Sequence, residues 1–352
     1  MSRLAGLLTR SWYASQATAL SLALLPLSWV FGACAALRRA GYRRGVFHGT
    51  RLPVPVVIVG NITVGGAGKT PLVAAIAAAL RESGFRPGIV SRGYGRRSDD
   101  VRRVVVGDDA CDAGDEPLIL AETGVPVWVG ADRPAAARAL LVDSPDVDVI
   151  VSDDGLQHYA LARDVEIAVV DGDRALGNGH LLPAGPLREP ASRLASVDAV
   201  VRLRSTRTPR DGADYSMTQV PQPWRNVADP ARAFDAGLLR DPAAVAIAGI
   251  AHPERFFALL TAQGFAGRTH AFPDHYAYSR DDVAFPAASA VLMTQKDAVK
   301  CRAFADARMW MLPIRAEVDR ALIELVVEKV DGSQVARDAR VPRHEGTADP
   351  RP

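Results

Sequence analysis

Cysteine, lysine and net charge are all scarce in this sequence, and each scarcity excludes a class of protein. The 352 residues contain three cysteines, too few and too far apart for a disulfide framework or a zinc site, so a reducing compartment is expected. A formal charge of +2 gives no basis for nucleic-acid binding, and none is expected. Lysine is so rare beside arginine that a lysine in a glycine-rich loop is more informative than any single arginine; the lysines are Lys69, Lys296, Lys300 and Lys329.

Charge is also missing from one long segment near the N-terminus. Residues 11–37 contain no charged side chain, and their apolar core is long enough to cross a bilayer or lie deep in it. Arginines at 38, 39, 43 and 44 follow directly, which places the rest of the chain on the cytosolic side. A cleaved signal peptide ending near residues 33–35 and a buried helix are the alternatives. The prediction is that residues 1–50 attach the protein to a membrane, either spanning it or lying at its interface.

The remainder of the chain alternates short apolar runs with helical stretches. Residues Val54–Val59 form a β-branched run typical of a buried parallel strand, and the sequence TPLVAAIAAALRES after the next loop is helical by propensity. This alternation predicts an α/β fold with a parallel sheet covered on both faces. Further strands are expected at Pro87–Val90, Val125–Val129, Val147–Ser152, Glu166–Val170 and Val197–Leu203.

Changes in composition divide the chain into further segments. Residues 51–204 carry the first α/β domain, and residues 205–242, rich in Pro, Arg and Asp, are expected to be a connection with a hinge. A smaller C-terminal α/β domain is predicted over 243–330, and residues 331–352 lack an apolar pattern and are expected to be a disordered tail. The elements expected in the smaller domain are strands at Ala244–Ile250, Ala290–Thr294 and Met309–Leu312 and helices near Pro253–Gly264 and Val318–Val330.

The stretch GNITVGGAGKTP at residues 60–71 joins a strand to a helix as a phosphate-binding P-loop does. Glycines let backbone N–H groups face phosphate oxygens, and the start of the helix adds a positive dipole. Lys69 would reach the β- and γ-phosphates of a nucleotide, and the Thr70 hydroxyl would bind Mg²⁺. The usual motif has glycine where this chain has Thr63, so a simple glycine turn is the alternative. The residues predicted to bind ATP are Thr63, Val64, Gly65, Gly66, Ala67, Gly68, Lys69 and Thr70.

Carboxylates at two other places complete a candidate kinase site. Asp153 and Asp154 end an apolar strand, where a P-loop protein holds Mg²⁺, although an Asp-Asp-Gly turn is the simpler alternative. Asp115 could be a general base that accepts a proton from an attacking hydroxyl, with Glu116 nearer the metal, or it could only cap the following helix. His275 stands alone in a turn, and a single histidine in such a place is usually structural or solvated.

Seven motifs follow one another along the chain: GNITVGGAGKTP, SRGYGR, GDEP, SDDGLQH, LLPAGPLREP, FPDHY and TQKDAVK. Together and in this order they resemble the motifs of the tetraacyldisaccharide 4'-kinase family of lipid A biosynthesis. The resemblance reaches about residue 330 and implies a P-loop kinase with a smaller second domain, located at the cytoplasmic face of the inner membrane. The implied reaction transfers the γ-phosphate of ATP, with Mg²⁺, to the 4'-hydroxyl of a lipid A disaccharide 1-phosphate. The implied partners are this substrate and the membrane surface, with no obligatory protein partner.

Carried over position by position, the resemblance implies a role for each matching residue. Lys69 and Thr70 hold phosphate and Mg²⁺, and Asp115 acts as the base, paired with His275 from the second domain. The other matching residues are Glu116, Asp153 and Asp154 around the metal, Gln157 and His158 in support of the site, Arg188 and Glu189 near the acceptor or the transferring phosphate, and Asn61, Tyr94 and Arg133 as looser correspondences.

Two other function classes would use a similar loop. A nucleotide-switched GTPase or metallochaperone would need an N-K-x-D motif and clustered Cys/His ligands, and TQKD at 294–297 matches that motif poorly. A soluble P-loop small-molecule kinase or synthetase would have no use for residues 11–37. The chain departs from the family at Ala67, where many members carry a hydroxyl residue, and at Gln295, where Glu is common.

Overall fold

The computed structural model describes residues 3–14, 16, 18–204 and 215–338, and these residues form two α/β domains. Nine strands of this described part make the larger sheet, which is parallel except at its two edges. In spatial order they are β14 (Ile314–Val318), β8 (Tyr215–Pro221), β7 (Ala199–Leu203), β6 (Val165–Asp171), β1 (Val56–Gly60), β5 (Val149–Asp153), β2 (Pro87–Ser91), β4 (Val127–Val129) and β3 (Arg102–Val104).

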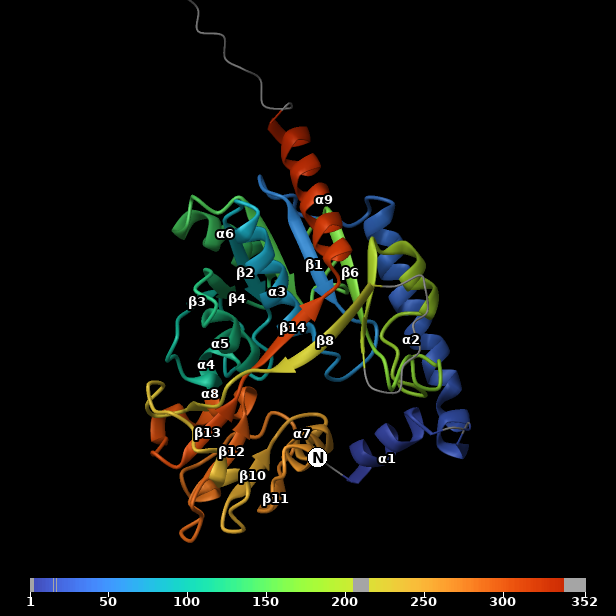
Figure 1. The fold of residues 1–352 in the computed structure, drawn as a ribbon. Coiled ribbons are helices and arrows are strands. Elements are labelled where there is room, and N and C mark those ends of the chain that lie inside the picture. The colour runs from blue at the N-terminus through green and yellow to red at the C-terminus, as the bar shows by residue number, and fades with distance from the viewer. Residues whose placement is uncertain (1–2, 15, 17, 205–214, 339–352) are drawn as a thin grey trace, which may run out of the picture.

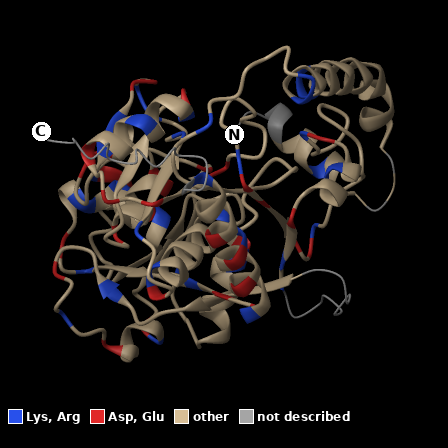
Figure 2. Cartoon of the chain, turned by 90° about the horizontal axis from the view of Figure 1, so that it is seen from above, with Lys and Arg blue, Asp and Glu red and all other residues tan. Residues whose placement is uncertain are grey.

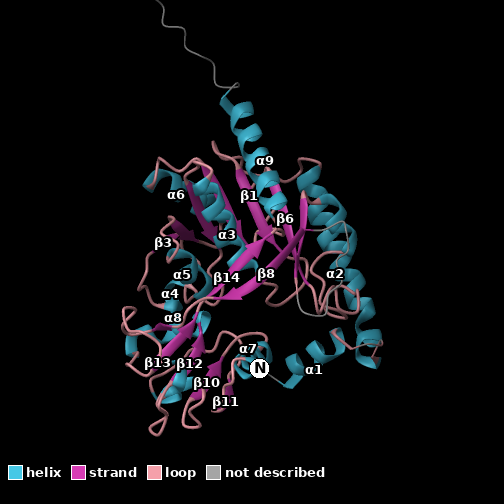
Figure 3. Cartoon of the chain, viewed as in Figure 1, coloured by secondary structure: helices cyan, strands magenta, loops and turns pink. Residues whose placement is uncertain are grey.

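Helices cover both faces of this larger sheet (Figure 3). Successive side chains of a strand point to opposite faces, and β1 shows the result: Val57 and Val59 pack into one apolar cluster, while Val56 and Ile58 pack into another. The α/β fold class and the buried parallel strand predicted from the β-branched run are therefore confirmed. The helices of the described chain are α1 (Arg3–Trp12), α2 (Ala19–Arg43), α3 (Lys69–Glu82), α4 (Ala110–Ala113), α5 (Asp115–Ala121), α6 (Arg133–Asp143), α7 (Pro253–Ala262), α8 (Gln295–Cys301) and α9 (Arg320–Asp338).

The smaller domain lies against one end of the larger sheet (Figure 1). Its own core separates into two apolar clusters, with Val245 and Ile247 of one inner strand in the first and Ala246 and Ala248 of the same strand in the second. Acidic and basic residues are interspersed through both domains (Figure 2), in keeping with the small net charge. The five strands described in this domain are β11 (Arg268–Ala271), β10 (Val245–Ala248), β12 (Val291–Thr294), β13 (Met309–Leu312) and β9 (Arg225–Asn226), all parallel except β9.

The chain crosses between the domains twice, and this corrects the predicted connection over 205–242. Residues 205–214 lie outside the described part, but residues 215–221 form β8 of the larger sheet and residues 225–226 form β9 of the smaller one. The chain returns to the larger domain at Pro313, whose carbonyl accepts a hydrogen bond from the backbone N–H of Gln222 at 2.9 Å. Most side chains of β8 are partly exposed, so its sequence lacks the continuous apolar run of the central strands. For this reason β8 was not predicted.

The last helix belongs to the larger domain, which corrects its assignment to the region 243–330. Helix α9 contacts α3, β1 and β6, and Leu322, Val326 and Val330 enter the main core cluster. The helix also continues to Asp338, so the tail predicted to be disordered from residue 331 is ordered over its first eight positions. An ion pair between Arg337 and Asp164, at 2.8 Å, holds this last part of the helix; residues 339–352 lie outside the described part.

Replacing Leu322 with alanine is expected to destabilise the larger domain by about 2–5 kcal/mol, because a fully buried leucine is removed from its core. Urea unfolding followed by circular dichroism measures the change. Val335, on the same helix but 60% exposed, provides the control, since its replacement with alanine is expected to change stability little. An equally small effect for the Leu322 variant would contradict the place of α9 in that core.

Helix α2 contains most of the uncharged N-terminal segment. By length and composition it is the one helix of the described chain that could cross a membrane, and little of it is buried. One side of the helix contacts the protein, since the Ser28 hydroxyl donates to the Leu181 carbonyl at 2.8 Å. Five large apolar side chains on it are more than half exposed: Leu22, Leu27, Trp29, Val30 and Leu37.

Candidate active site

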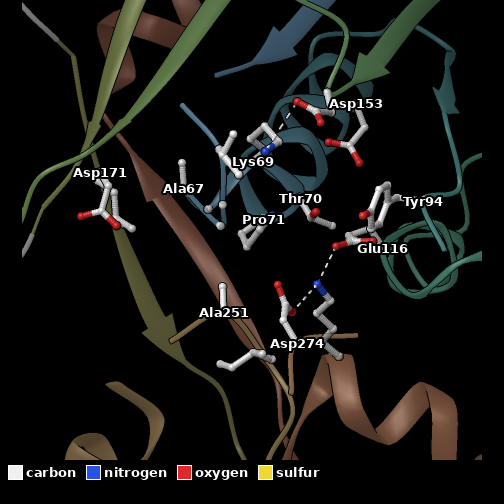
Figure 4. Close-up of a pocket in the computed structure, with 18 of the residues that line it drawn as sticks. Ala67, Lys69, Thr70, Pro71, Tyr94, Glu116, Asp153, Asp171, Ala251 and Asp274 are labelled. Atoms are coloured by element: carbon white, nitrogen blue, oxygen red, sulfur yellow. Dashed lines mark ion pairs between the residues drawn. The ribbon is translucent and has the colours of Figure 1, made fainter. Parts of the chain in front are cut away.

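A cleft of about 1760 Å³ separates the two domains and gathers most of the predicted site residues. The glycine loop and the acidic end of β5 line it from the larger domain, and residues 250–256, 274–275 and 294–296 line it from the smaller one. In Figure 4, Lys69, Thr70 and Asp153 lie on one side of this cleft and Asp274 on the other. The parallel strands end here, which is where ligands bind in open α/β sheets.

The glycine loop leads from the buried strand β1 to the first turn of α3. Gly65 and Gly68 have φ angles of 107° and 82°, in the region that favours glycine, and a side chain at Gly68 would meet Met217 and Gln219 at 3.0 Å. Thr63 stands where the usual motif has glycine, and its hydroxyl accepts a hydrogen bond from Asn61 at 3.3 Å. Since Thr63 also forms a β-bridge with Leu187, it joins the loop to residues 181–189.

Two side chains beside the glycine loop orient Lys69. Its ammonium donates to the Asn61 side-chain oxygen at 3.2 Å and lies 3.6 Å from a carboxylate oxygen of Asp154. Arg188 approaches the same carboxylate at 3.2 Å, and these two cations hold the pKa of Asp154 below its usual value despite its burial. Asp154 is therefore an anion that is neutralised by protein side chains.

Asp153, its neighbour, lacks such compensation. One of its carboxylate oxygens is buried and has no hydrogen-bond partner within the described part of the chain, and the other contacts the Ser91 hydroxyl at 3.4 Å. Burial and the adjacent Asp154 raise the pKa of Asp153 to about 7. Arg133 is buried below this turn and donates to the Asp153 carbonyl at 3.0 Å, which fixes the backbone and leaves the carboxylate free.

The structure brings Asp115 and His275 together although 160 residues separate them in the chain. Asp115 begins α5 and is buried, and its carboxylate lies 3.1 Å from His275 Nδ1. His275 reaches it from a turn of the smaller domain with a φ angle of 56°, and the Tyr94 ring lies 5.1 Å from the imidazole ring. The proximity of Asp115 and His275 therefore depends on contact between the domains.

Glu116 lies beside this pair, and its partner in this structure is a lysine. Its carboxylate forms an ion pair of 2.7 Å with the Lys296 ammonium, which also lies 3.5 Å from Asp274 (Figure 4). Burial would raise the pKa of Glu116, but the adjacent Lys296 ammonium lowers it. In this structure Lys296 neutralises Glu116, and the role of Glu116 near the metal stays a prediction.

The residues after β5 form a hydrogen-bonded network at the edge of the cleft. Gln157 donates to Glu189 at 3.0 Å and to the Asn61 carbonyl at 3.1 Å, and Tyr159 also hydrogen-bonds Glu189. Gln157 and Tyr159 thus hold the Glu189 carboxylate, which lines the cleft. Burial and three nearby arginines lower the pKa of His158 to about 4, which keeps this histidine neutral near pH 7.

Two lysines that contact predicted site residues were not predicted from the sequence, Lys296 and Lys300. Lys300 lies 3.8 Å from the Asp115 carboxylate and 3.0 Å from the buried Asp297. A signal was present in the sequence, because lysine is rare in this chain and these two are spaced four residues apart, on one face of a helix. Lys69 and Lys296 line the cleft, Lys300 lies beside the buried Asp115, and Lys329 pairs with Asp198 elsewhere.

Gln295 also contacts the larger domain. Its amide nitrogen donates to a carboxylate oxygen of Glu122 at 2.7 Å, and Arg302 forms an ion pair with the other oxygen of the same group. A glutamate at 295 would place a second carboxylate against Glu122. The neutral amide at this position is therefore suited to its partner, and it adds a contact between the domains.

Comparison with known proteins agrees with the sequence resemblance. The model of the tetraacyldisaccharide-1-P 4'-kinase family, LpxK, matches residues 20–331. A tetraacyldisaccharide 4'-kinase of Methylobacillus flagellatus is 48% identical over 92% of this chain and 95% of its own length. Another, of Azoarcus sp. strain BH72, is 52% identical over 88% and 92%. The crystal structure of the "apo" form of LpxK from Aquifex aeolicus in complex with ATP is similar with a TM-score of 0.75 and 28% identity, over 88% of this chain and 99% of that one.

Proposed function

Because this chain belongs to the tetraacyldisaccharide 4'-kinase family and is a lipid A 4'-kinase that uses ATP, we propose that Lys69, Asp115 and His275 carry the phosphoryl transfer. The observation that supports this assignment is the 3.1 Å contact of Asp115 with His275, whose side chain lines the same cleft as the glycine loop. A phosphate donor bound at the loop and an acceptor hydroxyl at Asp115 would share one cavity.

ATP is proposed to bind with its phosphates over residues 63–70. The backbone N–H groups of this loop and the N-terminus of α3 supply donors and a positive dipole. Lys69 is placed to offset negative charge on the β- and γ-phosphates, where charge neutralisation contributes most of the catalysis in phosphoryl transfer.

Mg²⁺ is proposed to be held by Asp153 and the Thr70 hydroxyl, with phosphate oxygens and water completing its shell. The unpartnered, buried oxygen of Asp153 fits this role, since a cation would neutralise it. The described residues contain no group of three His, Cys, Asp or Glu side chains that could hold a metal, and Mg²⁺ needs none because it keeps several waters. When bound, the ion would offset charge on the β- and γ-phosphates.

Asp115 is proposed to accept the proton of the 4'-hydroxyl as that oxygen attacks the γ-phosphorus. The new O–P bond forms as the bond to the ADP oxygen breaks, so the electron pair leaves with ADP. His275 either orients the Asp115 carboxylate or carries the proton away. A general base of this kind contributes about 10²–10⁴-fold to the rate.

The test of this function is ATP-dependent phosphorylation of a tetraacyldisaccharide 1-phosphate in mixed micelles. Radiolabel from the γ-position of ATP should appear at the 4'-position of the lipid with the wild-type protein. Absence of transfer would favour a soluble P-loop kinase, and water-soluble sugars would then be tested as acceptors.

Replacing Asp153 with asparagine is expected to raise the Mg²⁺ concentration needed for half-maximal activity by about 10- to 100-fold, because an anionic ligand is lost while the size of the side chain is kept. A titration with Mg²⁺ at saturating ATP measures the shift. The exposed Asp146, before the same strand, is the matched control, and its replacement with asparagine should leave the requirement unchanged. An unchanged requirement in the Asp153 variant would contradict the assignment.

Membrane attachment is proposed to occur through the exposed face of α2 rather than by crossing the bilayer, since the opposite side of the helix contacts the protein through Ser28. The arginines that follow the apolar segment would attract anionic headgroups at the cytoplasmic face, by about 1 kcal/mol each. An acylated acceptor resides in the bilayer, so this attachment would bring the cleft to its substrate.

Introducing three glutamates on this face, in a Leu27→Glu/Val30→Glu/Leu37→Glu variant, is expected to abolish co-sedimentation with vesicles containing phosphatidylglycerol. All three side chains are more than half exposed, so the fold should survive. A Val105→Glu/Val106→Glu/Val142→Glu variant adds the same charge at exposed apolar positions elsewhere and should still bind. Equal binding by both variants would exclude α2 as the attachment site.

A further inference from the structure

Helix α8 directs a lysine at the catalytic pair proposed above. The Lys296 ammonium lies 3.2 Å from His275 Nε2, 2.7 Å from Glu116 and 3.5 Å from Asp274. His275 thus has a different partner at each ring nitrogen, Asp115 at Nδ1 and Lys296 at Nε2. Histidine chemistry depends on which nitrogen carries the proton, and the other partner of the ring decides this.

The identity of the two partners determines the tautomer. An ammonium has only donors, so His275 Nε2 must accept from Lys296, and the single proton of the neutral ring then lies on Nδ1. From Nδ1 it is donated to the Asp115 carboxylate. The other carboxylates near Nε2, those of Glu116 at 3.9 Å and Asp274 at 4.0 Å, are too distant to accept a hydrogen bond from it.

Two carboxylates of the protein neutralise the charge of the Lys296 ammonium. The Glu116 carboxylate lies 2.7 Å from the ammonium and the Asp274 carboxylate 3.5 Å from it. If Nε2 were protonated in addition to Nδ1, its N–H would face the N–H groups of the Lys296 ammonium. Two hydrogen-bond donors and two positive charges would then lie in contact. The groups that face the imidazole are therefore Asp115, Glu116, Asp274, Lys296 and the Tyr94 ring, and the geometry favours a neutral ring.

We propose that Lys296 is a positioning residue for the phosphoryl transfer, which fixes His275 as the neutral Nδ1–H tautomer so that His275 orients the Asp115 carboxylate toward the acceptor hydroxyl. The inference rests on the proposed role of Asp115 as the base. It also decides between the two roles left open for His275, because a ring that donates from Nδ1 cannot take the proton from Asp115 there. The proton abstracted from the 4'-hydroxyl stays on Asp115 during the transfer.

Nitrogen NMR of the full-length protein in detergent, labelled in its histidine rings, tests the tautomer directly. A His275→Gln variant identifies the His275 signals. In the wild type, the Nδ1 signal of His275 should be that of a protonated nitrogen and the Nε2 signal that of an acceptor. A proton on Nε2 in the wild type would overturn the proposal without the use of any Lys296 variant.

Lys296→Met keeps the length of the side chain and removes the donor. It should give His275 a mixed tautomer and lower kcat by about 10- to 100-fold, as the loss of an outer partner of a catalytic group commonly does, with the KM for ATP unchanged. Lys296→Arg, which again only donates, should restore the Nδ1–H signal and most of the rate; recovery of neither would overturn the proposal. Lys329→Met, on the surface, should behave as the wild type.

The same measurements separate this inference from the function on which it rests. If Asp115 and His275 variants lose the transfer while Lys296→Met retains both kcat and a single tautomer, the Lys296 proposal alone fails. A higher KM for ATP with unchanged kcat would also overturn it, since Lys296 would then act only in binding. If Asp115 variants keep full activity, the assignment of the base fails first.

Discussion

Replacing Asp115 with asparagine is expected to lower kcat by about 10²–10⁴-fold, the contribution of a positioned general base. Asparagine keeps the shape of this buried side chain, but its amide cannot take the proton of the acceptor hydroxyl. The hydrogen bond from His275 Nδ1 can still be accepted by the amide oxygen, so the contact between the domains should survive. The measurement is steady-state transfer to the tetraacyldisaccharide 1-phosphate at saturating concentrations of both substrates.

ATP binding by the Asp115 variant should match that of the wild type, since Asp115 begins α5 and is not part of the glycine loop, and equilibrium binding of a fluorescent ATP analogue would report this. Asp112→Asn, three residues earlier and partly exposed, is the matched control and should retain full activity. Loss of ATP affinity in parallel with activity would refute the assignment of Asp115 as the base. His275→Ala should lower kcat in the same range, again with ATP binding retained.

Replacing Lys69 with alanine is expected to reduce transfer by at least about 10²–10³-fold, which is the usual cost of removing one preorganised donor to developing charge. Lys69 is held by Asn61 at 3.2 Å and by Asp154 at 3.6 Å, so little reorganisation is needed when phosphate binds. In the variant, Arg188 still pairs with Asp154, and the fold should therefore be kept.

Lys329→Ala removes a lysine from the surface and should leave the rate unchanged, which controls for the loss of positive charge alone. Thermal melting of both variants should agree with the wild type, so that a lower rate is not a folding defect. A rate for Lys69→Ala within about threefold of the wild type would remove the glycine loop from the proposed mechanism, because a donor that contributes to the transition state costs far more than this.

Local signals in the sequence were sufficient for the centre of the larger domain. The run VPVVIV, the glycine loop and the helix after it are neighbours in the chain, and each has a pattern that depends only on its own residues. Strands β8 and β14 lie at an edge of the sheet and are largely exposed, so their patterns were too weak for prediction. The position of α9 depends on tertiary packing through Leu322 and Val326, which no local pattern reveals.

The same distinction applies to the candidate site. Lys69 and Asp153 were predicted from motifs, whereas Asp115 and His275 were paired only through the family resemblance, because they come from separate domains. Lys296 was missed for a similar reason. Its partners, Glu116 and His275, lie far from it in the chain, and a lysine on a short polar helix otherwise predicts an exposed surface.

The two crossings between the domains lie side by side, joined by the hydrogen bond from Gln222 to Pro313. Because β8 and β14 are antiparallel partners, residues 222–313 form an insertion at the tip of what would otherwise be a simple hairpin. Excision of this insertion and closure of the hairpin with a short turn would retain Lys69 and Asp153 and remove His275 and Lys296. The residues proposed to bind phosphate and those proposed to control the base thus come from two different continuous parts of the chain, and a single insertion accounts for the second of these parts.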